Sequence, residues 1–270
     1  MTMQLGISTY TYGWAIGVNG QVSERPFTEN HLLEKVKTFG MSLVQIGDNL
    51  PLHEFSPDRL KDFADTARNN HIQIEVGARG LTAEHLDRYI QIALQLNASL
   101  IRFVIDQKNY EPALPAIIAI IQNVLPELEK HHITLGIENH DRLKTSEFEA
   151  IMDAVNSPHV GICLDSVNSM GAGEGLEQVV NALAPYTVNL HIKDFGIQRL
   201  PHAMGFQIDG RSAGKGMLNV PWLLENISQY GRCKTAILEQ WVVPETDLDL
   251  TVEKEERWAQ ESVDFLKNYF

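Results

Sequence analysis

The 270-residue chain lacks the features that mark several large classes of protein. It has only two cysteines, Cys163 and Cys233, which are too few for the disulfide framework of a small secreted domain. It has no run of 18 apolar residues, so we expect no membrane-spanning helix. The segment from Met1 to Gly6 has neither a basic region nor a long apolar one, so we expect no signal peptide and a cytoplasmic location.

Basic residues are also scarce. The chain has 22 Lys and Arg against 35 Asp and Glu, which gives a net charge of −13. Binding to nucleic acids or to anionic membranes relies on a basic surface, so we expect neither as a partner. A composition with 44% hydrophobic and 21% charged residues is ordinary for a globular protein. A chain of this length buries enough surface to fold without a metal or a disulfide.

Apolar runs of strand length alternate with segments of helical periodicity along the whole chain. The predicted strands are Leu5–Ser8, Leu43–Ile46, Ile72–Val76, Leu100–Ile105, Ile133–Ile137, Val160–Leu164, Thr187–Ile192 and Thr235–Leu238. The predicted helices are Asn30–Phe39, Pro57–Asn69, Ala83–Leu96, Pro112–Glu129, Ser146–Val155, Leu176–Ala184, Pro221–Tyr230 and Glu253–Asn268. This alternation predicts parallel β-α-β units, and eight units in about 250 residues predict a closed barrel. The predicted fold is therefore an α/β protein, a (β/α)8 TIM barrel, in one domain over residues 1–270.

One connection is much longer than the others. Phe195–Val220 separates the seventh predicted strand from the next helix and is rich in glycine and polar residues. It leaves the C-terminal face of the barrel, where sites are built. We expect a lid or a substrate loop here.

The last four predicted strands all end on a polar or ionisable residue. These residues are Glu138, Asp165, His191 and Glu239. In a parallel barrel, all four side chains would point into the same mouth. One carboxylate after one strand is often only a loop cap, but four residues at matching offsets indicate a shared site.

Electrostatics then argues for a bound cation. Three carboxylates about 4–5 Å apart repel one another by roughly 3–4 kcal/mol per pair, and the total is comparable to the stability of a whole domain. Either some carboxylates are protonated or a cation binds among them. Two Glu, one Asp and one neutral His suit Mn²⁺, Mg²⁺ or Co²⁺, and Zn²⁺ is also compatible.

The residues around these strand ends carry a resemblance to a known family. The motifs are Ile137-Glu138-Asn139, Leu164-Asp165, His191-Ile192-Lys193-Asp194 and Leu238-Glu239. They resemble the xylose isomerase-like TIM-barrel superfamily, the sugar phosphate isomerase/epimerase group, over nearly the whole chain. The resemblance implies that Glu138, Asp165, His191 and Glu239 bind one divalent metal. It also implies that Glu138 and Glu239 act as the catalytic acid/base pair, one on each face of the substrate.

Two positions depart from the pattern of this superfamily. Asn168 stands where many relatives have a histidine, and Gln45 stands where glutamate is frequent. Both departures argue against a standard ketose 3-epimerase. The further histidines that a DNA-repair endonuclease of this superfamily uses for its zinc cluster are also absent at the matching places.

Further candidates surround the predicted mouth. Lys193 is a catalytic candidate that could neutralise a substrate carboxylate or polarise a carbonyl, and the alternative is an ion pair with Asp194. Arginines here could hold an anionic substrate or form plain ion pairs, and aromatic side chains could line a sugar face or simply pack. The substrate-binding candidates are Tyr10, Trp14, Arg79, Arg102, His140, Asn168, Arg211 and Trp241.

These observations lead to three hypotheses about function. The first is a divalent-metal-dependent isomerase or epimerase in carbohydrate metabolism, acting on a small ketose, inosose or related keto-sugar through an enediolate. The second is a lyase, a dehydratase or decarboxylase of a 3-oxo sugar acid on the same metal site, which a cationic mouth favours. The third is a non-catalytic sugar-binding barrel. A homo-oligomer is expected only by analogy with the superfamily.

Overall fold

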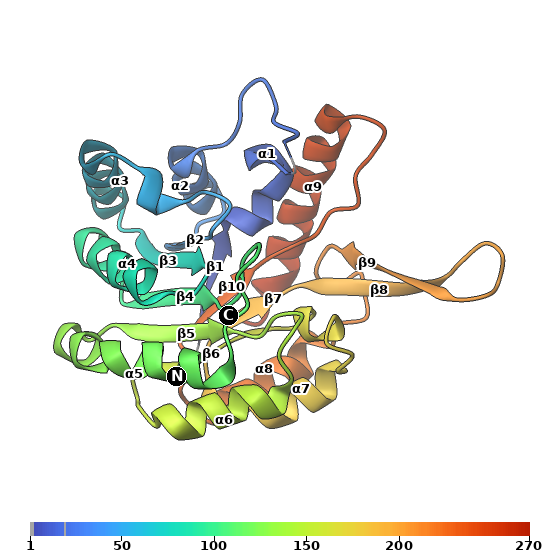
Figure 1. The fold of residues 1–270 in the computed structure, drawn as a ribbon. Helices are drawn as coiled ribbons and strands as arrows, with labels where there is room; N and C mark the ends of the chain where they lie inside the picture. Colours follow the sequence, from blue (N-terminus) through green and yellow to red (C-terminus); the bar gives the residue numbers. More distant parts are fainter. Residues whose placement is uncertain (1–2, 19) are drawn as a thin grey trace.

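The computed structural model describes residues 3–18 and 20–270, and its centre is a closed parallel β-barrel (Figure 1). The strands follow one another around the barrel in the order β1-β10-β7-β6-β5-β4-β3-β2. Their bounds are β1 Gln4–Ser8, β2 Leu43–Ile46, β3 Gln73–Arg79, β4 Leu100–Val104, β5 Thr134–Glu138, β6 Val160–Asp165, β7 Thr187–Ile192 and β10 Thr235–Leu238. The predicted (β/α)8 barrel is confirmed.

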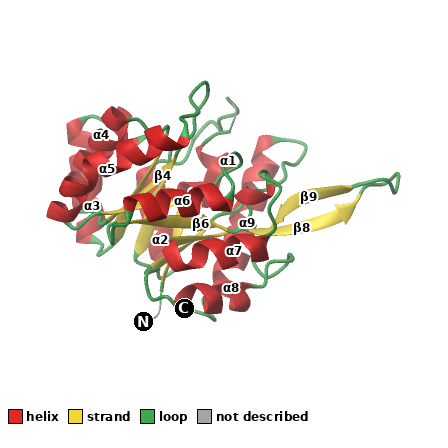
Figure 2. Cartoon of the chain, turned by 60° about the horizontal axis from the view of Figure 1, so that its bottom comes forward, coloured by secondary structure: helices red, strands yellow, loops and turns green. Residues whose placement is uncertain are grey.

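Helices surround the barrel and bury one face each against its strands (Figure 2). Their bounds are α2 Glu29–Thr38, α3 Pro57–Asn69, α4 Ala83–Leu96, α5 Leu114–His131, α6 Thr145–Val155, α7 Leu176–Leu183, α8 Val220–Ser228 and α9 Leu248–Leu266, with a short α1, Gly13–Ile16, after β1. The last helix begins earlier than predicted because the Asp247 side chain caps it, accepting a hydrogen bond from the Leu250 amide at 2.9 Å. Among the described residues, no helix is both long and apolar enough to cross a membrane.

The long connection after β7 is a β-ribbon rather than a bare loop. Strands β8, Asp194–Arg199, and β9, Phe206–Arg211, pair antiparallel and project from the barrel (Figure 1). Asp194 holds the base of this ribbon: its carboxylate accepts hydrogen bonds from the backbone amides of Gly214, Gly216 and Leu218 at 2.9–3.0 Å. A Cβ at Gly216 would overlap the Asp194 carboxylate, so this turn requires glycine.

Helix α9 also fixes the segment that follows β1. The two carboxylate oxygens of Glu255 accept hydrogen bonds from the backbone amides of Trp14 and Ala15, each at 2.9 Å. Burial raises the pKa of Glu255 from 4.5 to about 7, against the opposing effect of those amides. The folded protein therefore binds a proton here in a pH range where the unfolded chain has released it.

The pH dependence of stability should report this proton. Because the pKa is higher in the folded state, the stabilisation is complete below about pH 4.5 and is lost as the pH rises toward 7. The loss is at most about 3 kcal/mol for a shift of this size. Urea unfolding between pH 4.5 and 8 should show a shallower pH profile for Glu255→Gln than for the wild type. Parallel profiles for the two proteins would contradict the assignment.

Candidate metal centre

The four predicted ligand residues meet at the C-terminal mouth of the barrel. Glu138 ends β5, Asp165 ends β6, His191 lies near the end of β7, and Glu239 follows β10. All four are at most 2% exposed. His191 Nδ1 lies 3.3 Å from Glu239 Oε1 and 3.7 Å from Glu138 Oε2. Ligand atoms of Asp165, His191 and Glu239 all lie within 4.8 Å of one another, a spacing that could hold one metal ion.

The hydrogen bonds behind His191 determine which of its nitrogens faces the carboxylates as a ligand. The Gln45 side-chain amide nitrogen donates to Glu75 Oε2 at 3.0 Å and to Asn189 Oδ1 at 3.1 Å. The Gln45 oxygen therefore faces His191 and accepts the Nε2 proton at 2.8 Å. In the neutral imidazole, Nδ1 then carries the lone pair.

This arrangement fits a divalent cation. Among the described residues, the buried His191 Nδ1 has no hydrogen-bond partner, although carboxylates lie around it. A buried polar atom without a partner is costly unless something binds it. Metal-bound histidines usually donate their other ring N–H to a protein oxygen, as His191 does to Gln45. Carboxylate oxygens with one imidazole nitrogen suit Mn²⁺, Mg²⁺, Co²⁺ or Zn²⁺.

Lys193 lies among the same carboxylates. Its Nζ is 2.8 Å from Asp165 Oδ2 and 3.1 Å from Glu239 Oε2. Burial alone would lower the pKa of Lys193, but Asp165 and Glu239 outweigh burial and raise it above its ordinary value. The alternative ion pair with Asp194 is wrong, because the Asp194 carboxylate binds the backbone amides at the base of the ribbon.

A second group of charges lies beside Glu138. The buried Arg102 pairs with Glu138 and, at 2.7 Å, with Asp48, and Arg79 also pairs with Asp48 at 3.0 Å. Burial would raise the pKa of Asp48, but the two guanidinium groups hold it below its usual value. Arg79 also lies 3.2 Å from His140 Nε2, which places that predicted residue at the edge of the same group.

Of the remaining predicted substrate residues, Asn168 and Tyr10 contact the charged groups of the mouth, and the others make contacts elsewhere. Asn168 donates to Glu138 Oε1 at 2.8 Å, and the Tyr10 ring lies 5.7 Å from the Arg102 guanidinium, so both belong to the mouth. Trp14 instead donates its indole N–H to the Val242 carbonyl at 2.9 Å. Arg211 lies in the ribbon and donates to the Gly210 carbonyl at 2.6 Å. Trp241 is half-buried. Its backbone carbonyl packs against Gly210 so closely that a side chain at position 210 would overlap it.

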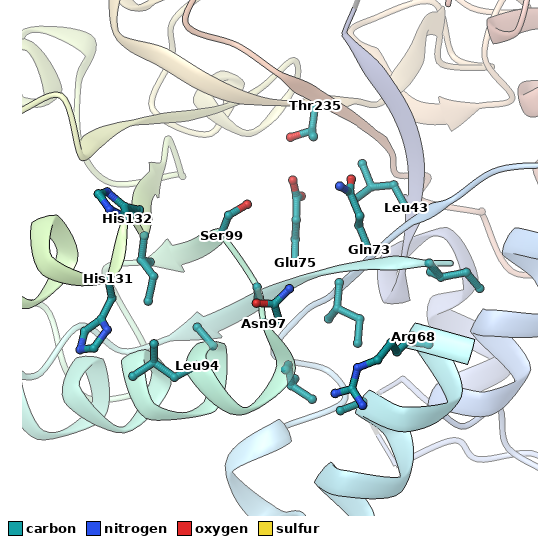
Figure 3. A pocket seen from close by; sticks show the side chains of 18 of the residues that line it. Leu43, Arg68, Gln73, Glu75, Leu94, Asn97, Ser99, His131, His132 and Thr235 are labelled. Atoms are coloured by element: carbon teal, nitrogen blue, oxygen red, sulfur yellow. The ribbon is translucent and has the colours of Figure 1, made fainter. Parts of the chain in front are cut away.

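Sequence reasoning missed the polar residues that support the site from inside the barrel. Glu75, in the middle of β3, is linked to Gln45 and to Asn189, which donates to Glu75 Oε2 at 3.2 Å. Burial raises the pKa of Glu75. Glu75 also lines a cavity of about 660 Å³ at the N-terminal end of the barrel. Figure 3 shows the carboxyl group of Glu75 pointing toward Thr235. Hydrogen bonds through Gln45 thus connect this end of the barrel to His191 in the candidate metal centre.

Gln45 should therefore tune metal affinity without contacting the metal. Gln45→Leu removes the acceptor of the His191 Nε2 proton, so we expect Mn²⁺ affinity to fall by about 10–100-fold. Gln45→Glu keeps an acceptor oxygen for His191 but loses the amide group that donates to Glu75 and Asn189, so Mn²⁺ affinity should fall less than for Gln45→Leu. Isothermal titration calorimetry with Mn²⁺ measures both. Equal affinities for Gln45→Leu and the wild type would show that this hydrogen bond does not matter.

The chain is similar to known proteins over nearly its whole length. A family model described as the xylose isomerase-like TIM barrel matches residues 33–269. The 3-oxo-isoapionate decarboxylase of Pectobacterium atrosepticum is 33% identical over 264 residues, which cover 98% of this chain and 95% of the decarboxylase.

Two solved structures share the fold at low sequence identity. A D-psicose 3-epimerase, solved in the presence of D-fructose, aligns with a TM-score of 0.72 at 15% identity over 99% of both chains. A xylose isomerase-like TIM-barrel protein from Mycobacterium smegmatis, in complex with magnesium, aligns with a TM-score of 0.71 at 14% identity over 98% of both chains. At such identities these two structures establish the common fold alone.

Proposed function

Because this chain belongs to the xylose isomerase-like TIM-barrel family, we propose that it is a divalent-metal-dependent lyase that decarboxylates a small 3-oxo sugar acid. The family includes enzymes that act on sugars, and the relative at 33% identity is named for a decarboxylation of a 3-oxo compound. Its name supports the reaction class, and the charges at the mouth support the substrate class.

The observation that carries the proposal is the number of cations at the mouth. Arg79, Arg102 and Lys193 lie among the carboxylates of Asp48, Glu138, Asp165 and Glu239. A divalent cation added to this set would make the local charge positive. A positive mouth attracts an anionic substrate, and a neutral ketose lacks the charge for this attraction.

The residues can be assigned roles in such a reaction. Glu138, Asp165, His191 and Glu239 would hold the metal, which when bound would polarise the substrate carbonyl and stabilise the negative charge that develops on its oxygen. Arg79, whose side chain is 32% exposed, is the mouth arginine that a substrate carboxylate can reach. When the bond to the carboxylate breaks, its electron pair moves toward the carbonyl oxygen and CO2 leaves. Lys193 lies beside Glu239 and would return a proton to the carbon.

Isomerisation or epimerisation is the second candidate, and one observation favours it. Glu138 and Glu239 approach His191 Nδ1 from different strands of the barrel. Two carboxylates on different sides of a bound substrate could remove a proton and return it. The two candidates use the same metal site and differ in which bond breaks.

One experiment separates them. The protein is loaded with Mn²⁺, Mg²⁺ or Co²⁺ in D2O and incubated with 3-oxo sugar acids and, separately, with neutral ketoses and inososes. The proposal expects one CO2 per acid consumed and deuterium at the carbon that lost its carboxylate. Deuterium in a ketose with its carbon skeleton intact would establish the isomerase instead. Ligand binding with neither reaction would indicate a sugar-binding barrel.

Arg79 provides a test of the substrate class. Arg79→Gln should raise the KM for the acid by about 10–100-fold, because a hydrogen bond between charged groups contributes about 1.5–3 kcal/mol. Arg142→Gln is the matched control: Arg142 is 31% exposed and pairs with Asp106 at 2.6 Å, as Arg79 pairs with Asp48. Steady-state kinetics with the acid gives the KM of both variants. An equal change in KM for the two variants would remove Arg79 from the substrate site.

A further inference from the structure

The cavity of about 660 Å³ lies at the N-terminal end of the barrel, at the opposite end from the candidate metal centre. Strand beginnings and helix ends surround it, and Figure 3 shows the side chains that line it. They include Gln73, Ser99 and Ile133 at or just before the beginnings of β3, β4 and β5, and Arg68, Leu96 and His131 near the ends of α3, α4 and α5. Of the described residues that line the cavity, none is a proposed metal ligand or substrate residue.

One wall of the cavity is aliphatic. Its side chains come from two neighbouring helices, α3 and α4, and they are Ala64, Ala67, Ala93, Leu94 and Leu96. Leu94 is 37% exposed, so part of this wall is open to an entering molecule. An aliphatic surface of this kind favours contact with a hydrocarbon group over contact with water.

The described lining contains a single acid, Glu75, which is only 4% exposed. Its Oε2 accepts hydrogen bonds from the side-chain amides of Gln45 and Asn189, so this carboxyl group is arranged as an acceptor. Among the described residues, no lysine or arginine pairs with it, and burial raises its pKa. A buried carboxyl group in such surroundings takes up a proton unless a cation comes close to it.

The opening of the cavity also favours a positive charge. Helices α3, α4 and α5 end here, and the C-terminal end of a helix carries a partial negative charge. The basic side chains nearby are already paired. Arg68 lies 2.8 Å from Asp65, and His131 Nε2 lies 3.3 Å from Glu127. The acid inside the cavity therefore has no competing free arginine at the opening.

The two parts of the lining together identify the chemical class of the ligand. A bare inorganic cation would match Glu75 but would leave the aliphatic wall without a contact. A hydrocarbon without charge would cover the wall but would leave the buried carboxyl group without a cation. A molecule that carries an ammonium group on a short hydrocarbon body matches both.

We propose that this cavity binds a small aliphatic amine, with its ammonium group paired to Glu75 and its hydrocarbon part packed on the wall formed by α3 and α4. The site lies outside the metal centre, so this proposal does not depend on the reaction that is catalysed there.

The first test compares hexylamine with 1-hexanol, which has the same hydrocarbon part but no charge. Isothermal titration calorimetry at about pH 8 keeps the amine charged and unperturbed imidazoles neutral. We expect the wild type to bind hexylamine about 10–100-fold more tightly than 1-hexanol, because a hydrogen bond between charged groups is strong. Glu75→Gln keeps the shape of the side chain and should bind the two compounds equally, with its affinity for 1-hexanol unchanged.

Three results would overturn the proposal. The first is a wild type that binds hexylamine no more tightly than 1-hexanol, which includes the case in which it binds neither. The second is a preference for the amine that survives in Glu75→Gln. The third is displacement of hexylamine by K⁺, which would assign the cavity to an inorganic cation.

A second pair of variants tests the site without changing a buried residue. Leu94→Lys places an ammonium group on the wall of the cavity, so it should weaken hexylamine binding by at least about tenfold through repulsion between like charges. Gln95→Lys is the matched control, because Gln95 is exposed on the same helix and does not line the cavity. It should bind hexylamine within a few-fold of the wild type. Equal affinities for the two variants would place the amine elsewhere and reject the proposal.

Discussion

Glu239→Gln is expected to abolish both metal binding and turnover. Glu239 Oε1 lies 3.3 Å from His191 Nδ1 and accepts a hydrogen bond from the Ser8 hydroxyl at 3.2 Å, and its Oε2 lies 3.1 Å from Lys193. Glutamine keeps the shape of the side chain but removes its charge and one strong ligand oxygen. We expect Mn²⁺ affinity to fall by at least about 100-fold, and activity by on the order of 1,000-fold at a metal concentration that saturates the wild type.

Calorimetry with Mn²⁺ and a CO2-release assay measure the two effects. Glu255→Gln is the control, because Glu255 is also a buried glutamate at 1% exposure but lies outside the cluster. It should bind Mn²⁺ like the wild type. If Glu239→Gln bound metal normally, Glu239 would not be a ligand. If the wild type kept full activity after complete removal of metal by a chelator, the proposed chemistry would be wrong.

The gathering of the four proposed ligands could be predicted from the sequence because of one property of parallel barrels. All strands place their C-terminal ends at the same mouth, so Glu138, Asp165, His191 and Glu239 could be assigned to one site without knowledge of any contact. The position of Lys193 follows from the same logic. On an extended strand, residues two apart point to the same side, so Lys193 follows His191 toward the mouth and Asp194 does not.

The residues inside the barrel could not be predicted in this way. Gln45, Glu75 and Asn189 come from three different strands, and their contacts depend on the register and closure of the barrel. A polar residue in the middle of a strand has no local spacing that reveals its partner. The candidate site therefore has two layers, proposed ligands that strand ends reveal and supporting residues that only the three-dimensional structure reveals.

The ribbon was missed for a different reason. Its alternating residues, Ile197 with Arg199 and Phe206 with Ile208, span only two positions on each strand. Glycine and polar residues surround them, so the segment resembles a loop in composition. Period-two alternation this short is a weak signal of a strand.

Arg102→Met is expected to destabilise the protein more than any other single change at the mouth. The Arg102 side chain is 3% exposed and pairs with both Glu138 and Asp48. Burial alone would lower the pKa of Arg102, but these two carboxylates raise it well above its ordinary value. Removal of the guanidinium would leave Glu138 without its arginine and Asp48 with Arg79 alone, and breaking a buried pair costs about 3–5 kcal/mol. The urea midpoint should fall accordingly, with little change in m.

A double-mutant cycle shows whether charge is the cause. Asp48→Asn in the Arg102→Met background removes a carboxylate that has lost one of its two arginine partners, so it should restore part of the lost stability, whereas Asp48→Asn alone should destabilise the wild type. If the two changes were simply additive, the cost of Arg102→Met would be lost packing and not lost charge. The outcome matters for the metal centre as well. Arg102 and Asn168 hold the two oxygens of Glu138, so the arginine that stabilises the fold also orients a proposed metal ligand.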